Sequence, residues 1–281
     1  MSPSGRAETA DLRRRIAEIE TRAVPGGVGE RAQRRFKLAR ALDRALGGGL
    51  AEDALHEIVP AAPQDGPAAT GFALALAARI LSQRPSAALV IGEGFAAEEF
   101  GALYGPGLDA HGLPLPRLVF VRAQDAGAAL FAMEEALKSG APAAVMGELF
   151  SVKPYGLAAS RRLILAARQG RTPALLVLAG AHGLAERLST AAETRFEIAA
   201  APSARMAAAA GKALPGPFAC RARLLKARLP LLGEGMSEAA DPARIHRLEW
   251  RGEERTFDDP AIPLALAAAS FDRPRAAASS H

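Results

Sequence analysis

Apolar residues form short runs that alternate with amphipathic stretches from residue 54 onward. Runs with the length and β-branched content of buried strands cover residues 54–59, 87–93, 117–123, 143–149 and 173–180. Apolar residues at helical spacing lie between these runs, at 71–83, 126–140 and 157–170. Short apolar strands joined by helices are typical of parallel sheets covered on both faces. The pattern therefore predicts an α/β fold with a mostly parallel sheet flanked by helices.

The pattern changes after residue 200. An alanine-rich segment and the breaker Pro215-Gly216-Pro217 precede two strand-like segments, 218–232 and 244–257. The second segment contains Arg251-Gly252-Glu253, a sequence suited to a hairpin turn. We therefore expect a small C-terminal β extension over residues 204–270.

The two ends of the chain differ in composition from the α/β core expected over residues 31–203. Residues 1–30 combine a short stretch with Leu12, Ile16 and Ile19 at helical spacing with the breaker that begins at Val24, so they predict a helix and a flexible leader. Residues 271–281 are too polar to pack and predict a disordered tail.

The composition narrows the class of protein. The 281 residues include 35 basic and 30 acidic residues and one cysteine, Cys220, which cannot form an internal disulfide. The first twenty residues are rich in charge, unlike a signal peptide. The longest apolar stretch, 71–81, contains Arg79 and is about half the roughly 20 residues of a membrane helix. We expect a cytoplasmic protein with no membrane segment.

The segment 60–71 lies between a predicted strand and a predicted helix, which is where phosphates bind in many α/β proteins. A phosphate-binding loop needs a lysine immediately before Ser or Thr, but Ala69 precedes Thr70. Only five of the 35 basic residues are lysines, and none lies in this segment. The segment predicts a connecting surface loop, with Gly66, Thr70 and Gly71 as a remnant of a nucleotide site.

Two carboxylates follow predicted strands at the edge where α/β proteins bind ligands. Glu148 near the end of the 143–149 strand is a candidate metal ligand, and Glu93 at the end of the 87–93 strand is a candidate for activating a water. Glu148 is equally suited to a helix cap or a loop contact, and Glu93 has no phosphate cradle nearby that would supply a substrate. The scattered histidines have no metal-ligand spacing, and no serine or cysteine lies in a nucleophile motif, so we expect no metal site and no catalytic nucleophile.

Clustered cations are candidates for contact with DNA or with an acidic partner. They lie on the 157–170 helix and the first C-terminal strand and comprise Arg161, Arg162, Arg221, Arg223, Lys226 and Arg228. The alternative is a solvated surface with a few ion pairs. Few aromatic residues lie nearby to stack bases, so we expect little DNA affinity from the chain alone.

Several segments resemble the ImuA family, the accessory proteins of bacterial damage-inducible mutagenesis cassettes. The resemblance covers about residues 36–255 and is carried by the following segments: LDRALGGGLAEDALHEI (42–58), YGPGLDAHGLPLPRLVFVRAQDAGAALFAMEEALKSGAPAAVMGEL (104–149), ASRRLILAARQGRTPALLVL (159–178) and ETRFEIAAAPS (193–203). The ImuA family is itself similar to a shortened RecA recombinase, so the resemblance implies a RecA-like core.

The resemblance also implies a function in the SOS response. Its expected partners are RecA, a Y-family polymerase homologue and an error-prone DNA polymerase. The RecA nucleotide loop corresponds to residues 60–71, the magnesium aspartate to Gly147 or Glu148, and the hydrolytic glutamate to Glu93 or Gly94. Because the lysine is missing, we expect a noncatalytic adaptor for translesion synthesis with no cofactor. The alternative is a weak DNA-stimulated ATPase, with ATP and magnesium, or a DNA-binding RecA paralogue.

Overall fold

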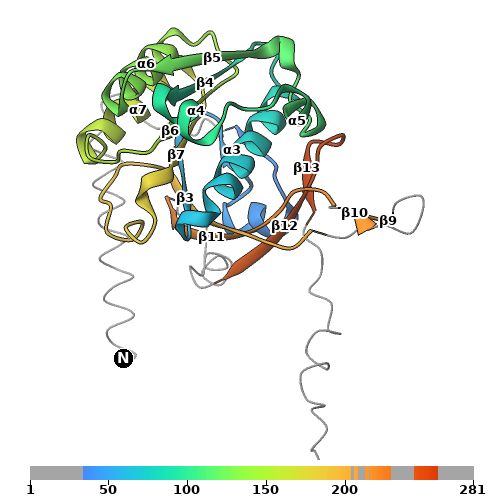
Figure 1. Cartoon of the computed structure of the whole chain (residues 1–281). Coiled ribbons are helices and arrows are strands. Elements are labelled where there is room, and N and C mark those ends of the chain that lie inside the picture. The colour runs from blue at the N-terminus through green and yellow to red at the C-terminus, as the bar shows by residue number, and fades with distance from the viewer. Residues whose placement is uncertain (1–33, 204–205, 208–212, 215, 229–243, 259–281) are drawn as a thin grey trace, which may run out of the picture.

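A nine-stranded sheet forms the centre of the molecule (Figure 1). The computed structural model describes residues 34–203, 206–207, 213–214, 216–228 and 244–258. The strand order is β13-β12-β11-β8-β3-β7-β6-β4-β5. Six neighbouring strands run parallel: β3 (Leu55–Pro60), β4 (Ala88–Glu93), β5 (Leu118–Ala123), β6 (Ala144–Leu149), β7 (Ala174–Leu178) and β8 (Thr194–Ala200). This sheet confirms the predicted α/β class and is consistent with a RecA-like fold.

The C-terminal strands continue the same sheet in antiparallel orientation. They are β11 (Ala219–Ala227), β12 (Ile245–Arg251) and β13 (Thr256–Asp258). Strand β11 pairs with β8, β12 with β11, and β13 with β12, the last pair forming the predicted hairpin. The predicted β extension therefore adds to one edge of the core sheet through β8.

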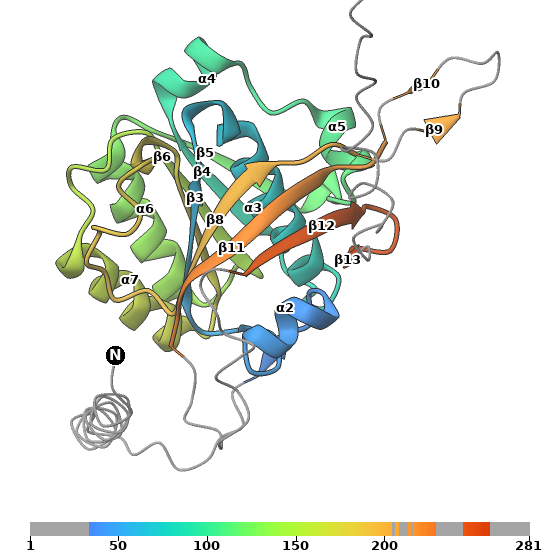
Figure 2. The same cartoon turned by 90° about the horizontal axis from the view of Figure 1, so that it is seen from below.

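Helices cover the two faces of the sheet (Figure 2). Helix α3 (Gly66–Leu81) lies on one face, with α2 (Arg40–Ala45) nearby, and α6 (Ala126–Ser139) and α7 (Leu157–Gly170) lie on the other. Two apolar cores follow from this arrangement, one against α3 and one against α6 and α7. Because consecutive strand residues point to opposite faces, each central strand contributes to both cores.

Five strands and two helices lie within a few residues of their predicted positions. The exception among the helices is α3, which begins at Gly66, five residues before its predicted start. Pro67 is compatible with this earlier start because the first turn of a helix needs no N–H from it. Strand β8 and the short helices α2, α4 (Gly94–Phe100) and α5 (Gly105–Ala110) were not predicted from periodicity.

The segment around α2 forms a small hairpin-like unit. Its ends, β1 (Arg35–Phe36) and β2 (Leu50–Ala51), pair in antiparallel orientation. Gly49 has a φ of 122°, and a Cβ atom there would lie 2.3 Å from the carbonyl oxygen of Phe36. Only glycine allows this approach, which explains the glycine-rich turn after α2.

The remaining described strands, β9 (Met206–Ala207) and β10 (Ala213–Leu214), form a separate short pair. The predicted leader at 1–30 and the predicted tail at 271–281 lie outside the described residues. Within the described part of the chain, no helix combines the length and apolar character needed to cross a bilayer.

Candidate functional site

The beginning of α3 lies where a RecA-like protein would bind the phosphates of a nucleotide. After β3, a single 3₁₀ turn (Pro63–Asp65) leads directly into the helix. The carboxylate of Asp65 is 8% exposed and accepts hydrogen bonds from the backbone N–H groups of Ala62 at 3.1 Å and Ala200 at 2.8 Å. A carboxylate of the chain itself therefore links this turn to the end of β8.

The groups at the start of α3 do not fit a magnesium-bound nucleotide triphosphate. Helix N-termini bind phosphate through free N–H groups and a positive dipole end, but Pro67 has no N–H and Asp65 brings a negative charge to the same end. The lysine that would neutralise the phosphates is missing from the sequence of this segment. The N-terminus of α3 is thus unsuited to an incoming anion.

Thr70 and Glu148 meet behind this helix start. The Thr70 hydroxyl donates to Glu148 Oε1 at 2.6 Å and lies 3.3 Å from the Gly66 carbonyl oxygen. Burial raises the pKa of Glu148, and the hydrogen bond from Thr70 offsets part of this increase. The two groups that a nucleotide site would direct at magnesium are therefore engaged with each other.

Glu93 lies on the opposite face of the sheet from this pair. Along β4 it shares a face with Ile91, in the core against α6 and α7, whereas Glu148 shares a face with Met146, in the core against α3. Glu93 is 4% exposed and accepts hydrogen bonds from the backbone N–H groups of Phe150 at 2.7 Å and Ser151 at 3.3 Å. It stabilises the loop after β6, and the sheet separates it from Thr70.

The two glycines of the predicted remnant also differ in their surroundings. A Cβ atom at Gly71 would lie 3.0 Å from the ring of Phe218, and the Gly71 carbonyl accepts a hydrogen bond from His111 Nε2 at 3.0 Å. Gly71 therefore serves packing between α3 and the C-terminal strands. A Cβ atom at Gly66 would meet no atom within 4 Å. The structure thus brings together only Thr70, Glu148 and the nearby Gly66 carbonyl.

A buried polar cluster on the α7 side of the sheet was not predicted from the sequence. Glu57 of β3 and Arg195 of β8 are partners in the strand register and form an ion pair, with Nε 2.6 Å from Oε2. The Tyr155 hydroxyl donates to the other oxygen of Glu57. Burial and the neighbouring Glu57 raise the pKa of Tyr155 well above its ordinary value. The sequence signal for this pair was the presence of opposite charges, Glu57 and Arg195, within two otherwise largely apolar strands.

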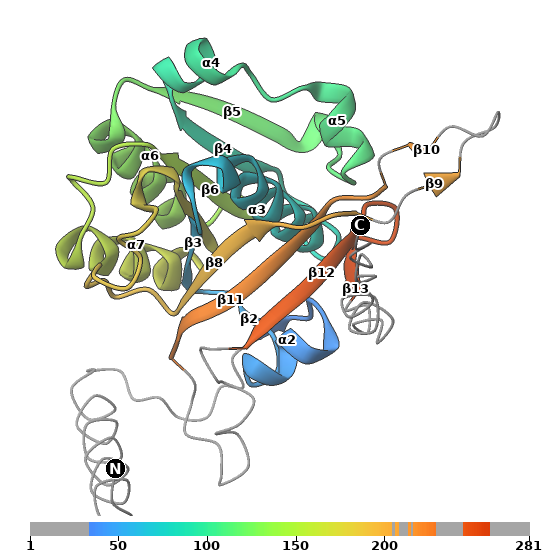
Figure 3. The same ribbon diagram turned by 60° about the horizontal axis from the view of Figure 1, so that its bottom comes forward.

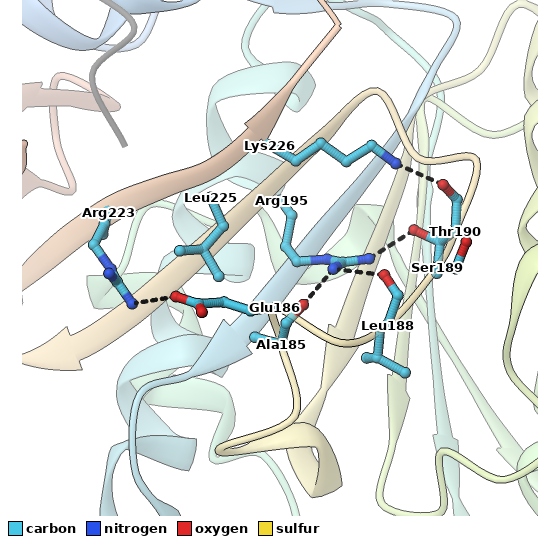
Figure 4. A pocket seen from close by; sticks show the side chains of 9 residues that line it. All are labelled: Ala185, Glu186, Leu188, Ser189, Thr190, Arg195, Arg223, Leu225 and Lys226. Carbon is cyan, nitrogen blue, oxygen red and sulfur yellow. Dashed lines mark hydrogen bonds and ion pairs between the residues drawn. The ribbon is translucent and has the colours of Figure 1, made fainter. Parts of the chain in front are cut away.

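Arg195 also anchors the loop between β7 and β8 (Figure 4). Its guanidinium donates to the carbonyl oxygens of Ala185 and Leu188 and to the hydroxyl of Thr190. Lys226 of β11 donates to the Thr190 carbonyl at 2.6 Å. These contacts border a groove of about 610 Å³ between the loop and strands β8 and β11.

The cations predicted to contact DNA or partners are divided among several roles. Arg223 pairs with Glu197, with an Nε to Oε2 distance of 2.8 Å, and lies 3.5 Å from Glu186 of the loop. Lys226 is bound to the loop through the Thr190 carbonyl. On the outer surface of α7, Arg162 is hydrogen-bonded to Glu134 of α6 at 2.7 Å. The exposed residues of the predicted set are Arg161, Arg162, Arg221 and Arg228.

A second groove, of about 750 Å³, lies between α2 and β13. Lys37, Arg40 and Arg44 line it together with Asp43. The Asp43 carboxylate accepts a hydrogen bond from the Leu38 N–H at 2.8 Å, and burial raises its pKa. Asp43 therefore stabilises the backbone that leads into α2.

Neither a protein-family model nor a curated protein was found to match the chain. Among the described residues, no three His, Cys, Asp or Glu side chains gather as they would around a metal ion. At the position where a RecA-like protein would bind a nucleotide, the side chains of Thr70 and Glu148 are hydrogen-bonded to each other.

Proposed function

We propose that the chain is a noncatalytic RecA-like accessory protein of SOS-induced translesion synthesis and DNA-damage-induced mutagenesis. In this function it acts in the cytoplasm as an adaptor to RecA and to the mutagenic polymerase components. The observation that carries the proposal is the hydrogen bond of Thr70 to Glu148, at 2.6 Å, near the start of α3, where the carboxylate of Asp65 binds the N–H of Ala200. Because Thr70 and Glu148 bind each other at the phosphate position, we infer that this RecA-like domain binds proteins and not a nucleotide.

The sheet architecture and the sequence resemblance support the same proposal. The ImuA-like segments include all or most of β3, β5, β6, β7 and β8, which are five of the six parallel strands, together with α6 and most of α7. Binding rather than chemistry is also supported by the carboxylate of Glu93 on the opposite face of the sheet, because it accepts hydrogen bonds from backbone N–H groups and is nearly inaccessible to solvent.

Nucleotide binding distinguishes this proposal from a weak ATPase. Titration of the purified chain with a fluorescent ATP analogue and magnesium is expected to give no saturable signal. Saturable, magnesium-dependent binding that the Thr70→Val substitution abolishes would favour the ATPase instead. The matched control is Thr256→Val, which removes a half-buried threonine hydroxyl on β13.

Partner binding tests the adaptor function directly. Purified RecA, the Y-family polymerase homologue and the error-prone polymerase are each immobilised, and the chain is passed over them with and without single-stranded DNA. Association with at least one of them is expected, and it should persist without nucleotide. Absence of binding to all three, together with absence from complexes isolated from DNA-damaged cells, would remove the proposal.

A further inference from the structure

Strand β5 forms one edge of the sheet, and within the described residues no strand other than β4 pairs with it (Figure 3). It pairs with β4 alone, and the backbone groups of Leu118–Ala123 form no other backbone hydrogen bond within the described residues. Two large apolar side chains are exposed there, Val119 at 47% and Phe120 at 52%. An edge of this kind is a template for a further strand.

The opposite edge of the sheet is protected in the usual ways. Strand β13 has three residues, and the guanidinium of Arg251 on β12 pairs with the carboxylate of Asp258 on β13. Short length and charge both discourage the addition of another strand. Strand β5 is twice as long, and Arg122 is its only charged residue. The contrast indicates that the β5 edge becomes covered.

We propose that a second copy of this chain covers it, with the two β5 strands paired in antiparallel orientation about a two-fold axis at Phe120. Phe120 then lies opposite Phe120 of the second copy, and Val119 lies opposite Val121. Directly opposed residues in an antiparallel pair share a face of the sheet, so apolar side chains meet on both faces. The pairing also satisfies the open backbone groups of both strands.

The strand itself favours a second copy as the occupant. Val119 faces the α6 side and Phe120 the α3 side, because Val121 packs with the core against α6 and Leu118 with the core against α3. The occupant must therefore present apolar side chains on both faces in alternation. Strand β5, with the sequence LVFVRA, has this property and contains no acidic residue that would be buried in the pair.

The charges are also compatible with self-pairing. The arrangement places Arg122 opposite Leu118 of the second copy, so that the two arginines lie at opposite ends of the paired region. Helix α5 lies beside the beginning of β5 and contributes the exposed carboxylate of Asp109 (Figures 1 and 3). Each Arg122 thus approaches the end of the other copy that carries an acidic side chain. Two-fold symmetric pairing of this kind is the commonest form of self-association.

Sedimentation equilibrium of the purified full chain tests the proposal without any partner or nucleotide. A mass approaching twice 29.2 kDa is expected. Val119→Lys and Phe120→Lys should each restore the monomer, because a lysine on either face would be buried in the pair. The control is Leu165→Lys on α7, where the side chain is 64% exposed and far from β5 in sequence, and this variant should remain dimeric.

Cysteine cross-linking tests the position of the axis. The single native cysteine, Cys220, is buried, so a cysteine introduced by Phe120→Cys provides the accessible thiol. Opposed Cα atoms in an antiparallel pair lie about 4.5–5.5 Å apart, within the range that a disulfide spans. Mild oxidation should therefore yield a covalent dimer of the Phe120→Cys variant and none of the Leu165→Cys variant.

Three results would overturn the proposal. They are a monomeric wild-type chain throughout the accessible concentration range, a dimer that survives both lysine substitutions, and a dimer whose Phe120→Cys variant does not cross-link. A monomer would exclude a second copy as the occupant of this edge. The proposed adaptor function is independent of this outcome, because it is tested by binding to RecA and the polymerases.

Discussion

Arg195 and Glu57 form an ion pair that connects neighbouring strands of the parallel sheet in its interior. Arg195 Nε lies 2.6 Å from Glu57 Oε2, and the side chains are 4% and 0% exposed. The remaining donors of Arg195 bind the loop between β7 and β8, and the second oxygen of Glu57 accepts from Tyr155. One buried charge thereby holds the sheet, the loop and the segment before α7 together.

Loss of Arg195 is expected to destabilise the fold strongly. Arg195→Met leaves the Glu57 carboxylate buried without its cation, which typically costs about 3–5 kcal/mol of unfolding free energy. Urea denaturation measures this cost. Arg221→Met on β11 is the control, because an exposed arginine should change stability by less than about 0.5 kcal/mol.

A double-substitution cycle separates the pair from its surroundings. Glu57→Gln combined with Arg195→Met should be more stable than the sum of the single losses predicts, because neither charge is then left alone. If the losses of unfolding free energy are additive, the two residues contribute independently and do not form a coupled network.

Glu148 is expected to make stability depend on pH. Its pKa is raised in the folded state by burial, so the ionised carboxylate costs stability at neutral pH, and this cost disappears as pH falls through the folded pKa towards the unfolded value. Glu148→Gln should therefore unfold at an equal or higher temperature than the wild type at pH 7.5. The advantage should vanish at acid pH.

Glu98→Gln is the control for this measurement, because Glu98 is exposed on α4. A Glu148→Gln variant that is clearly less stable at neutral pH would indicate that the charged form of Glu148 is required, as it would be in a cation site. Melting curves recorded between pH 7.5 and 4 distinguish the two outcomes.

His56 should contribute to acid denaturation. Burial lowers its pKa to about 4, and the neutral ring lies between the Thr194 hydroxyl at 2.8 Å and the Ala51 carbonyl at 2.9 Å. The unfolded chain binds a proton near pH 6.5 whereas the folded chain does not, so stability falls from about pH 6.5 towards pH 4. The loss over this window is roughly 3 kcal/mol.

His56→Gln should flatten the dependence of unfolding free energy on pH between 6.5 and 4, whatever its effect at pH 7.5. His182→Gln replaces an exposed histidine and should leave the slope unchanged. Equal slopes in the wild type and the His56→Gln variant would contradict the assignment of this titration to His56.

Lys226 is expected to restrain the loop between β7 and β8. Its Nζ donates to the Thr190 carbonyl, so Lys226→Met should expose the loop more often and accelerate tryptic cleavage after Arg187, an exposed residue of that loop. Arg221→Met also removes one cation from β11, but Arg221 is exposed and does not line the groove, so this substitution should leave the cleavage rate unchanged. Equal cleavage of both variants would argue against the restraint.

Much of the parallel sheet could be predicted because its strands are short apolar runs separated by amphipathic helices. Strand β8 was harder to predict, since Arg195 and Glu197 interrupt its apolar pattern. The reason for this interruption lies 138 residues earlier in the sequence, at Glu57. A charged residue in a strand indicates a partner, but the identity of that partner depends on which strands become neighbours.

The candidate site was predicted by residue type and corrected by geometry. The missing lysine and the acidic residues near the ends of β4 and β6 were visible in the sequence. The separation of the two acidic residues was not visible, because Glu93 and Glu148 lie near the ends of similar strands and differ in the face of the sheet to which they point. The register of β4 with β6 and the packing of α3 decide that Thr70 contacts Glu148 and not Glu93.

The sequence by itself determined the α/β class, the positions of most elements and the loss of the phosphate-binding lysine, because these depend on local periodicity and residue chemistry. Only the tertiary structure decided that Arg195 binds Glu57, that Glu93 lies across the sheet from Thr70, and that the apolar strand β5 lies at an open edge. Each of these depends on strand order. The apolar pattern of a strand indicates that its side chains need to be buried. The position of the strand in the sheet decides whether neighbouring strands and helices of the same chain bury them.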